Sequence, residues 1–134
     1  MSTFQLTIVT PDGEYYHGPA ESLTVRATTG ELTLLAHHID FVTALGMGEA
    51  RVTIDGQKRS ACCIGGMLAM TNGECKLIAT TFEWAEDIDQ ARAQNALARA
   101  QETLKDKEHL SAAQLQLAEA KLRRALVRTS LGGK

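Results

Sequence analysis

The segment EDIDQARAQNALAR, Glu86 to Arg99, marks the place where the character of the sequence changes. No Gly or Pro occurs between Ile88 and Leu104, and alanine is the most frequent residue there. Apolar residues recur at spacings of three and four, as on a helix that buries one face. The stripe consists of Ala93, Ala96, Leu97, Ala100 and Leu104. The segment therefore predicts an amphipathic helix that divides the chain into an earlier and a later part.

The part before this segment, residues 1–84, has the pattern of short β-strands. Apolar and polar residues alternate from Phe4 to Ile8, as in a strand with one buried face. The dipeptides Asp55-Gly56 and Asn72-Gly73 favour tight hairpins, because both residue types tolerate positive φ. Many short strands with regular turn signals predict an antiparallel sandwich or barrel.

A second helix is predicted after a short polar link at about residues 106–110. Ser111 followed by Gln114 matches a capping box, the signature of a helix start. Two helices joined by a short link form an antiparallel hairpin. The apolar stripe of the second helix comprises Leu115, Ala118, Leu122, Ala125 and Leu126.

The predicted fold class is therefore mixed β + α. We expect an N-terminal antiparallel β-sandwich over residues 1–84 and a C-terminal antiparallel two-helix hairpin over residues 85–134. Alanine stripes bury little apolar area, so the hairpin is expected to be weakly held. Two alternatives remain open at this point, a moving hairpin and a static appendage.

Charge is unevenly distributed between these two parts. Residues 1–84 carry nine acidic and five basic side chains, whereas residues 85–134 carry seven acidic and nine basic ones. The whole chain has a net charge of −2, which gives no argument for nucleic-acid binding. The basic C-terminal end suits an acidic surface or an anionic ligand, and it equally suits the dipole of its own helix.

The three cysteines and the absence of a targeting segment indicate the cellular compartment in which the protein is expected. Cys62, Cys63 and Cys75 show no spacing typical of zinc sites. We expect reduced, mostly buried thiols, with the adjacent Cys62 and Cys63 on opposite faces of a strand. No signal peptide or long apolar run is evident, so we expect a soluble, cytosolic protein without direct membrane insertion.

Sequence motifs of common enzyme classes are missing. The chain has no phosphate-binding loop, no zinc-protease motif and no nucleophile elbow. The pair His37-His38 lacks convergent Cys or acidic partners, so we expect a loop that touches a partner and no metal site. Gly65-Gly66 indicates a bulge or a close backbone approach. We therefore expect a protein that is not an enzyme and requires no cofactor.

Four arginines in the hairpin suggest an anion site. Folding the hairpin about residue 110 brings Arg92 beside Arg128, and it places Arg99 and Arg124 towards the same open end. Guanidinium groups that converge repel one another unless an anion lies between them. Arginine forks suit phosphate oxygens, so a polyphosphate is the natural ligand. Asp89 would then order Arg92 or accept a hydrogen bond from the ligand.

The alternative is an ordinary helix start. Glu86, Asp87 and Asp89 lie where a helix begins, and negative charge suits the dipole there. Asp89 and Arg92 are three residues apart and can form a surface ion pair, which contributes little to stability. Spacing alone leaves both interpretations open.

Four stretches, in this order and spacing, resemble the epsilon subunit of bacterial rotary, F-type ATP synthases. The resemblance implies a ten-stranded β-sandwich followed by two helices. It also implies that Ile88 to Ala93 is the family's Ile/Leu-Asp-x-x-Arg-Ala motif. The four stretches are VTPDGEYYHG (Val9–Gly18), GELTLLAHH (Gly30–His38), IGGMLAM (Ile64–Met70) and EDIDQARA (Glu86–Ala93).

By this resemblance the chain would be a central-stalk rotor subunit without catalytic activity. Its sandwich would bind the gamma subunit and the c-ring, and so couple proton translocation to ATP synthesis. Its helices would either fold on the sandwich or extend into the alpha/beta catalytic hexamer and inhibit ATP hydrolysis. The protein would lie at the cytoplasmic face of the bacterial membrane, attached through the complex. Alternatives are a constitutive coupling subunit that binds no nucleotide and a free-standing ATP sensor.

The resemblance also implies two sets of site residues. ATP, as a regulatory ligand of the folded hairpin, would be bound by Glu83, Ile88, Asp89, Arg92, Ala93, Arg99, Arg124 and Arg128. Protein partners would be contacted by Thr10, Glu31, His38 and Thr43. The chain departs from the family at Thr33, Ala36, His37 and Asp40, where Gly, Pro, Gly and Pro are usual.

Overall fold

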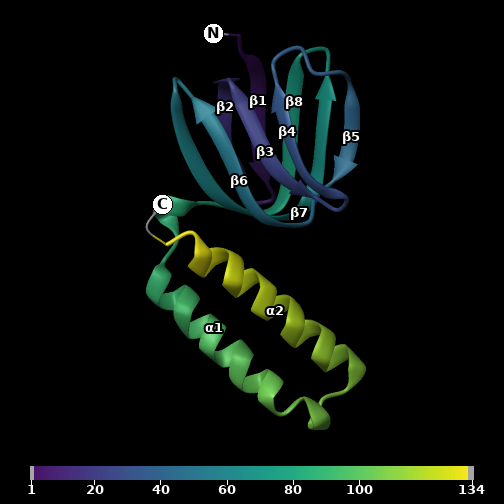
Figure 1. Cartoon of the computed structure of the whole chain (residues 1–134), viewed down its shortest axis with the longest axis vertical. Helices are drawn as coiled ribbons and strands as arrows, with labels where there is room; N and C mark the ends of the chain where they lie inside the picture. The colour runs from purple at the N-terminus through teal and green to yellow at the C-terminus, as the bar shows by residue number, and fades with distance from the viewer. Residues whose placement is uncertain (1, 133–134) are drawn as a thin grey trace.

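Strands occupy the chain as far as Trp84 in the computed structural model, which describes residues 2–132 (Figure 1). A helical hairpin follows and lies beyond one end of the strands. The predicted fold class is confirmed. The strands are β1 (Phe4–Thr10), β2 (Gly13–Ala20), β3 (Ser22–Ala27), β4 (Gly30–Leu35), β5 (Phe41–Ala44), β6 (Met47–Ile54), β7 (Gln57–Thr71) and β8 (Glu74–Trp84).

Two long strands run through both layers of the sandwich. On one side of β7, its first half pairs with β6 and its second half with β5, while β8 pairs along its other side. One layer is thus β2-β1-β8-β7-β5 and the other β4-β3-β6-β7-β8. The described residues form eight strands and not the ten that the resemblance implied, because β7 and β8 stay continuous where they pass between layers.

The passage of β7 between the layers depends on glycine. Gly65 and Gly66 have φ values of +68° and +107°, which disfavour side chains. A Cβ on Gly66 would lie 1.9 Å from the carbonyl oxygen of Ile78. The predicted close backbone approach at this dipeptide is confirmed.

One strand pair departs from the predicted antiparallel arrangement. β1 lies beside β8 in parallel, with Leu6 opposite Cys75 and Ile8 opposite Leu77. The other pairs of named strands are antiparallel. No hairpin turn joins the first and last strands, so no local turn determines their relative direction.

Tight turns form where the sequence predicted them. Asp55 and Gly56 have φ values of +51° and +76°, and Asn72 and Gly73 have +51° and +78°. Both dipeptides join antiparallel neighbours, β6 to β7 and β7 to β8. Two consecutive positive φ values fit a turn whose twist matches that of the flanking strands.

The sandwich core consists of large apolar side chains from both layers. Tyr15 packs edge-on against Phe82, and Phe82 against Trp84, with ring centroids 5.6 and 5.0 Å apart. Such edge-to-face pairs add to the stabilisation that burial supplies. Fully buried members of the core include Leu6, Ile8, Leu23, Val25, Leu34, Val52, Leu68, Met70 and Leu77.

The hairpin follows a single helical turn, η1 (Ala85–Asp87). Helix α1 spans Gln90–Lys105, the turn η2 spans Lys107–His109, and α2 spans Ala112–Ser130. Ser111 and Gln114 form the predicted capping box at the start of α2. Gly133 and Lys134, which the sequence placed at the end of the hairpin, lie outside the described residues.

Within the two helices, the buried side chains are all alanines. They are Ala93 and Ala100 on α1, and Ala118 and Ala125 on α2. Leu126 was expected in this stripe but is 46% exposed. The prediction for Leu126 was wrong because the buried stripe of α2 is only as wide as these alanines, and Leu126 lies a further 100° round the helix.

A small apolar cluster, the hairpin seat, joins the hairpin to the sandwich. It is separate from the sandwich core, and Met47 and Val127 pack against it. Cys62 belongs to the seat and Cys63 to the core, so these neighbours lie on opposite faces of β7 as predicted. The buried members of the seat are Cys62, Ile64, Ala85, Ile88, Ala93 and Leu131.

Polar contacts hold the chain at the joint between the two parts. The guanidinium of Arg59 lies 3.7 Å from the ring centroid of Trp84 and pairs with Glu86 at 2.5 Å. The side-chain amide of Gln90 donates to the carbonyl oxygen of Arg128 at 3.0 Å. These contacts link β7, η1 and the adjoining ends of both helices.

Candidate anion-binding site between hairpin and sandwich

Two adjoining cavities lie where the hairpin meets the sandwich. The larger has a volume of about 790 Å³ and the smaller about 460 Å³. Thr81, Ala96 and Arg128 line both of them. Each volume falls within the range of about 300–1,000 Å³ that small-molecule sites occupy.

The smaller cavity combines an aromatic wall with charged groups. Tyr15 and Phe82 come from the sandwich, and Ile88 and Ala93 come from the start of the hairpin. Its charged lining residues are Asp12, Glu83, Asp87, Asp89, Arg92 and Arg128. Apolar and aromatic walls with a few polar groups are typical of sites for heterocyclic ligands.

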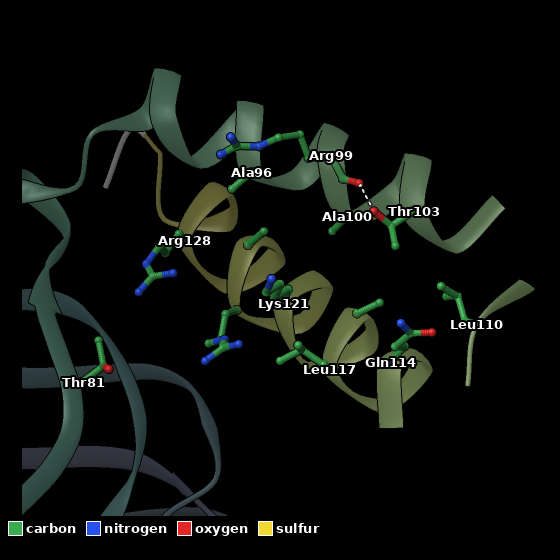
Figure 2. A pocket seen from close by; sticks show the side chains of 13 residues that line it. Thr81, Ala96, Arg99, Ala100, Thr103, Leu110, Gln114, Leu117, Lys121 and Arg128 are labelled. Atoms are coloured by element: carbon green, nitrogen blue, oxygen red, sulfur yellow. Dashed lines mark hydrogen bonds between the residues drawn. The ribbon is translucent and has the colours of Figure 1, made fainter. Parts of the chain in front are cut away.

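The larger cavity runs between the two helices, from Thr81 on β8 to Leu110 at the far end of the hairpin (Figure 2). Arg128 extends from α2 on the side nearest the sandwich, and Arg99 lies along α1 near Ala96. Its charged lining residues are Arg99, Lys121, Arg124 and Arg128, with no acidic residue among them. The cavity therefore favours an anion.

All eight residues of the predicted nucleotide site line one or other cavity. They do not surround one point, however. Arg92 lines the smaller cavity, Arg99 and Arg124 line the larger, and Arg128 lines both. The arginines are thus distributed along a path that spans two cavities.

Only one of these arginines has an acidic partner. Arg128 Nε donates to Glu83 Oε1 at 2.7 Å. Among residues 2–132, Arg92, Arg99 and Arg124 form no ion pair. Unpaired guanidinium groups around a cavity attract phosphate oxygens.

The ion pair that the alternative interpretation allowed between Asp89 and Arg92 is not formed. Asp89 is the N-cap of α1, and its Oδ1 accepts from the backbone N–H of Arg92 at 3.0 Å. The three-residue spacing places the backbone amide within reach of the carboxylate, and capping satisfies an N–H that the helix leaves without a partner. The Arg92 guanidinium is left available to the cavity.

The buried thiols are unsuited to covalent chemistry. Burial raises the pKa of Cys62 to about 11, and it raises the pKa of Cys63 and of Cys75 to about 12. All three are free and buried, as the sequence predicted. At neutral pH they remain protonated and therefore weakly nucleophilic.

Lys121 and the aromatic wall were missed by the analysis of the sequence. Lys121 lies three residues before Arg124 and seven before Arg128, so helical spacing alone indicates a shared face. Tyr15 and Phe82 carried no such signal. Their place in the smaller cavity depends on how the seat orients the hairpin against the sandwich.

The four predicted partner-binding residues lie on separate segments. Thr10 ends β1, Glu31 is on β4, His38 is in the β4–β5 connection and Thr43 is on β5. Within the described part of the chain, no side-chain hydrogen bond or ion pair joins any two of them. The β4–β5 connection lies at the end of the sandwich away from the helices (Figure 1).

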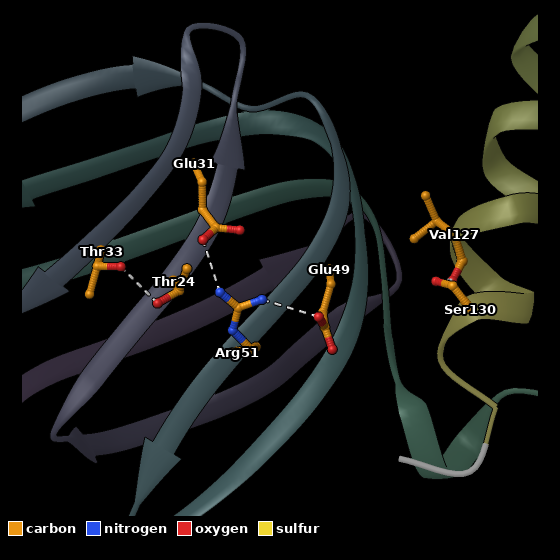
Figure 3. Close-up of polar contacts among 7 residues, drawn as sticks. All are labelled: Thr24, Glu31, Thr33, Glu49, Arg51, Val127 and Ser130. Carbon is orange, nitrogen blue, oxygen red and sulfur yellow. Dashed lines mark hydrogen bonds and ion pairs between the residues drawn. The ribbon is translucent and has the colours of Figure 1, made fainter.

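Glu31 takes part in an ionic bridge that crosses the sheet. Arg51 contacts Glu31 at 3.0 Å and Glu49 at 3.1 Å (Figure 3). Its hydrogen bonds to these carboxylates, to Glu49 first, raise the pKa of Arg51. In Figure 3, Glu49 lies on the part of the sheet that faces Val127 and Ser130 of α2. The bridge thus spans from β4 towards the hairpin.

The positions that depart from the family pattern run from strand β4, which contains Thr33, into the β4–β5 connection, and they make contacts of their own. Thr33 shares a hydrogen bond with Thr24 at 2.9 Å, and Asp40 accepts from the backbone N–H of Asn72 at 2.9 Å. His37 has a φ of +65°, a conformation that favours glycine. The usual family glycine at this position would adopt the same backbone without strain.

In residues 2–132, no group of three or more His, Cys, Asp or Glu side chains is arranged to hold a metal ion. Neither helix of this part is both long and apolar enough to cross a membrane.

Comparison with known proteins covers both parts of the chain. Residues 3–85 match the family model of the ATP synthase delta/epsilon chain β-sandwich domain, and residues 86–130 match that of its long α-helix domain. The ATP synthase epsilon chain of Bacillus pumilus is 35% identical over the full length of both chains. That of Caldanaerobacter subterraneus subsp. tengcongensis is 36% identical over 98% of this chain and 95% of the relative.

Solved structures share the fold. A chain of the Euglena gracilis mitochondrial ATP synthase superposes with a TM-score of 0.83 at 22% identity, over 97% of this chain and 81% of that one. A chain of the Tetrahymena thermophila mitochondrial ATP synthase central stalk and c-ring gives a TM-score of 0.65 at 12% identity, over 94% and 93%. On the family models and the full-length relatives, the chain belongs to the ATP synthase epsilon-chain family and is a non-catalytic subunit of that synthase.

Proposed function

We propose that this chain is a central-stalk rotor subunit whose hairpin restrains ATP hydrolysis, and that ATP bound between hairpin and sandwich holds the hairpin in its folded, permissive state. The observation that carries the proposal is a cationic cavity between two parts joined by a small apolar seat. A ligand that binds only one conformation stabilises that conformation. ATP in these cavities would therefore oppose release of the hairpin.

The rotor role draws on the solved structures and on an exposed apolar patch. The Tetrahymena chain belongs to a central stalk and c-ring assembly. In this chain Val42, Met67 and Ile78 are each at least half exposed on the paired strands β5, β7 and β8. Exposed apolar patches mark interaction surfaces. We propose that this patch binds the gamma subunit. Further contacts to gamma or the c-ring would come from Thr10, Glu31, His38 and Thr43. Through the complex, the protein would lie at the cytoplasmic face of the bacterial membrane.

The two cavities suit different parts of ATP. The adenine base fits the smaller cavity, where Tyr15, Phe82 and Ile88 supply apolar and aromatic surface. The phosphates fit the larger cavity, where Arg99 and Arg124 have no acidic partner among residues 2–132. Arginine forks bind phosphate oxygens strongly because both donors and acceptors carry charge.

ATP binding by the isolated chain is tested by calorimetry on matched variants. Arg124→Ala removes a cation that lines the larger cavity, whereas Arg123→Ala removes its neighbour, which lines neither cavity. Loss of a charge-assisted hydrogen bond costs about 1.5–3 kcal/mol, or roughly ten- to a hundredfold in affinity. We expect this loss for Arg124→Ala, and likewise for Arg92→Ala, with Arg123→Ala unchanged. Wild type that shows no heat of binding at millimolar ATP would overturn the nucleotide part of the proposal.

Restraint of hydrolysis is tested in the assembled complex. Truncation after Glu86 removes the hairpin but retains every strand and the Arg59–Glu86 contact. We expect ATP hydrolysis to rise while assembly with gamma and the alpha/beta hexamer is kept. Unchanged hydrolysis at all ATP concentrations would contradict an inhibitory hairpin, whereas loss of assembly would contradict gamma binding by the sandwich.

A second candidate function is a constitutive coupling subunit that binds no nucleotide. The Glu83–Arg128 ion pair favours it, because this pair satisfies one guanidinium without a ligand. That function predicts no heat of binding with ATP and normal assembly with gamma and the alpha/beta hexamer. A free-standing ATP sensor is separated from both by its failure to co-purify with the catalytic hexamer.

A further inference from the structure

The larger cavity extends well past its positive charges. The α2 residues that line it, from Gln114 to Arg128, recur at intervals of three and four with two adjacent pairs among them, so they follow one face of the helix. With a rise of 1.5 Å per residue, this face spans about 21 Å. Arg128, Arg124 and Lys121 occupy the half nearer the sandwich, and Leu117 and Gln114 the farther half.

The far half of this cavity, the outer compartment, differs in chemistry from the near half. It contains no charged residue among its lining side chains, which are Ala100, Thr103, Leu110, Gln114 and Leu117. Leu117 is 53% exposed, although it faces the cavity. Gln114 Oε1 accepts from the Ser111 amide at 2.9 Å, which anchors this side chain at the start of α2. An apolar wall with one amide and one hydroxyl suits a heterocyclic base.

A mononucleotide does not account for both compartments. With its base in the smaller cavity and its phosphates beside Arg99, Arg124 and Lys121, ATP would end at the last cation. Each cavity alone is large enough for a small ligand, since such sites take about 300–1,000 Å³. The order along the path is thus an aromatic compartment, a row of cations and a second apolar compartment.

We propose that this path binds a dinucleoside polyphosphate, with its phosphate chain on the cations and its second base in the outer compartment. The inference rests on the proposed function for the placement of the first base and the phosphates. Its own content is the outer compartment, and Leu117 is the residue that decides it. Exposed apolar surface that a base covers on binding contributes to affinity through burial.

Calorimetry on the full chain compares ATP, adenosine tetraphosphate and diadenosine tetraphosphate. The tetraphosphate lengthens the phosphate chain without a second nucleoside, so it separates the effect of charge from that of the base. We expect diadenosine tetraphosphate to bind about tenfold more tightly than either mononucleotide, equivalent to about 1.4 kcal/mol.

Two leucines on α2 supply matched variants. Leu117→Asn should bring diadenosine tetraphosphate to the affinity of ATP while ATP binding stays unchanged. Leu126 is similarly exposed, at 46% against 53% for Leu117, but lines neither cavity. Leu126→Asn should therefore keep the tenfold preference, and circular dichroism checks that both variants retain their helices.

The outcomes separate this inference from the proposed function. Equal affinity for diadenosine tetraphosphate and adenosine tetraphosphate would overturn the inference and leave ATP binding intact. A preference that survives Leu117→Asn would overturn it too, because the second base would then lie elsewhere. The absence of any heat of binding with all three ligands would overturn both proposals. A heat of binding with diadenosine tetraphosphate alone would support the inference and exclude ATP as the ligand.

Discussion

The sandwich and the hairpin are built from side chains of very different size. The sandwich core is made of residues such as Phe82, Leu23 and Leu68, and the helices bury only alanines. Burying a Leu or Phe side chain contributes about 1.5–3 kcal/mol, whereas a methylene-sized group contributes about 0.8 kcal/mol. The two regions thus share one chain but differ in how strongly each is held. This difference supports the proposal that the sandwich is a fixed platform and that the hairpin can leave it.

The seat lies between these extremes. It is apolar like the core, but its few buried side chains come from β7, η1, α1 and the residues just before α1 and just after α2. Regions with few buried apolar contacts open locally, with a smaller free energy than global unfolding requires. The predictions below test whether hairpin and sandwich do open separately.

The largest difference is expected from substitutions inside each region. Leu23→Ala empties part of the sandwich core, where Leu23 is fully buried, and should cost about 2–5 kcal/mol of unfolding free energy. Leu97→Ala, at a half-buried position on α1, should cost about 1 kcal/mol or less. All Phe, Tyr and Trp residues precede residue 85, so in urea denaturation near-ultraviolet circular dichroism follows the sandwich and far-ultraviolet circular dichroism follows the helices. Loss of both signals at one urea midpoint in every variant would show that the two regions unfold as one unit.

Adjacent cysteines give the next contrast, because Cys62 is covered by the hairpin and Cys63 by the sandwich core. In variants that retain one thiol each, we expect a maleimide to label Cys62 at least about a hundredfold faster than Cys63. This ratio corresponds to a difference of about 2.7 kcal/mol between the free energies of opening that expose the two thiols. Burial raises the pKa of these thiols to about 11 and about 12, so the closed state supplies little thiolate at neutral pH. Labelling therefore reports opening.

Truncation after Glu86 is the positive control, since it should make Cys62 reactive at once and leave Cys63 protected. Similar rates for the two thiols in the full chain would contradict separate opening of the hairpin.

A smaller effect is expected at the start of α1. Asp89→Ala removes the side chain that caps the Arg92 amide and should cost about 1 kcal/mol of helix stability. Asp89→Asn keeps an acceptor oxygen and should be nearly neutral. Amide hydrogen exchange in the first turn of α1 measures the difference. If Asp89→Asn keeps the cap but weakens ATP binding, the carboxylate charge itself acts on the ligand.

The smallest effect is expected in the β4–β5 connection, on the platform side of the comparison. His37→Gly relieves a left-handed conformation that costs roughly 1–2 kcal/mol, while glycine loses about 0.5–1 kcal/mol through chain entropy. The net gain should therefore lie between zero and about 1.5 kcal/mol. Ala36→Gly is the control, because Ala36 lacks a positive φ and should only lose stability. Thermal denaturation separates the two, and a loss in both would exclude strain at His37.

Structural features that depend only on residues close together in the sequence could be predicted from it. Asp55-Gly56 and Asn72-Gly73 encode their own backbone geometry, and Ser111 with Gln114 encodes a helix start. The two faces of β7 at Cys62 and Cys63 followed from strand alternation alone. Each of these is a local rule that no distant residue overrides here.

Structural features that join segments far apart in the sequence could not be predicted in this way. The parallel pairing of β1 with β8 brings Leu6 beside Cys75, and no turn between them sets its direction. The exposure of Leu126 depends on how wide a stripe the partner helix covers. Both are set by packing across the fold, which hydrophobic periodicity does not specify.

The candidate site likewise combines residues that the sequence predicted with residues that only the folded arrangement brings together. The shared faces of Arg92, Arg99, Arg124 and Arg128 followed from helical spacing, and the structure lines adjoining cavities with them. The aromatic wall did not follow, because the seat alone brings it to the hairpin. Glu83 came from the family resemblance, and its ion pair with Arg128 emerged only from the folded arrangement.

The stack of Arg59 on Trp84 at the joint has an optical consequence. Trp84 is the only tryptophan in the chain; the Arg59 guanidinium lies 3.7 Å from its ring centroid, and the Phe82 ring packs perpendicular to it with centroids 5.0 Å apart. Arg59 is held there by Glu86, which belongs to the turn η1 that leads into the hairpin. Movement of that turn alters the charge above the indole and with it the emission of the ring. The subunit thus carries a native fluorophore at the joint between sandwich and hairpin, and the proposed movement of the hairpin should change its emission in solution without an added dye.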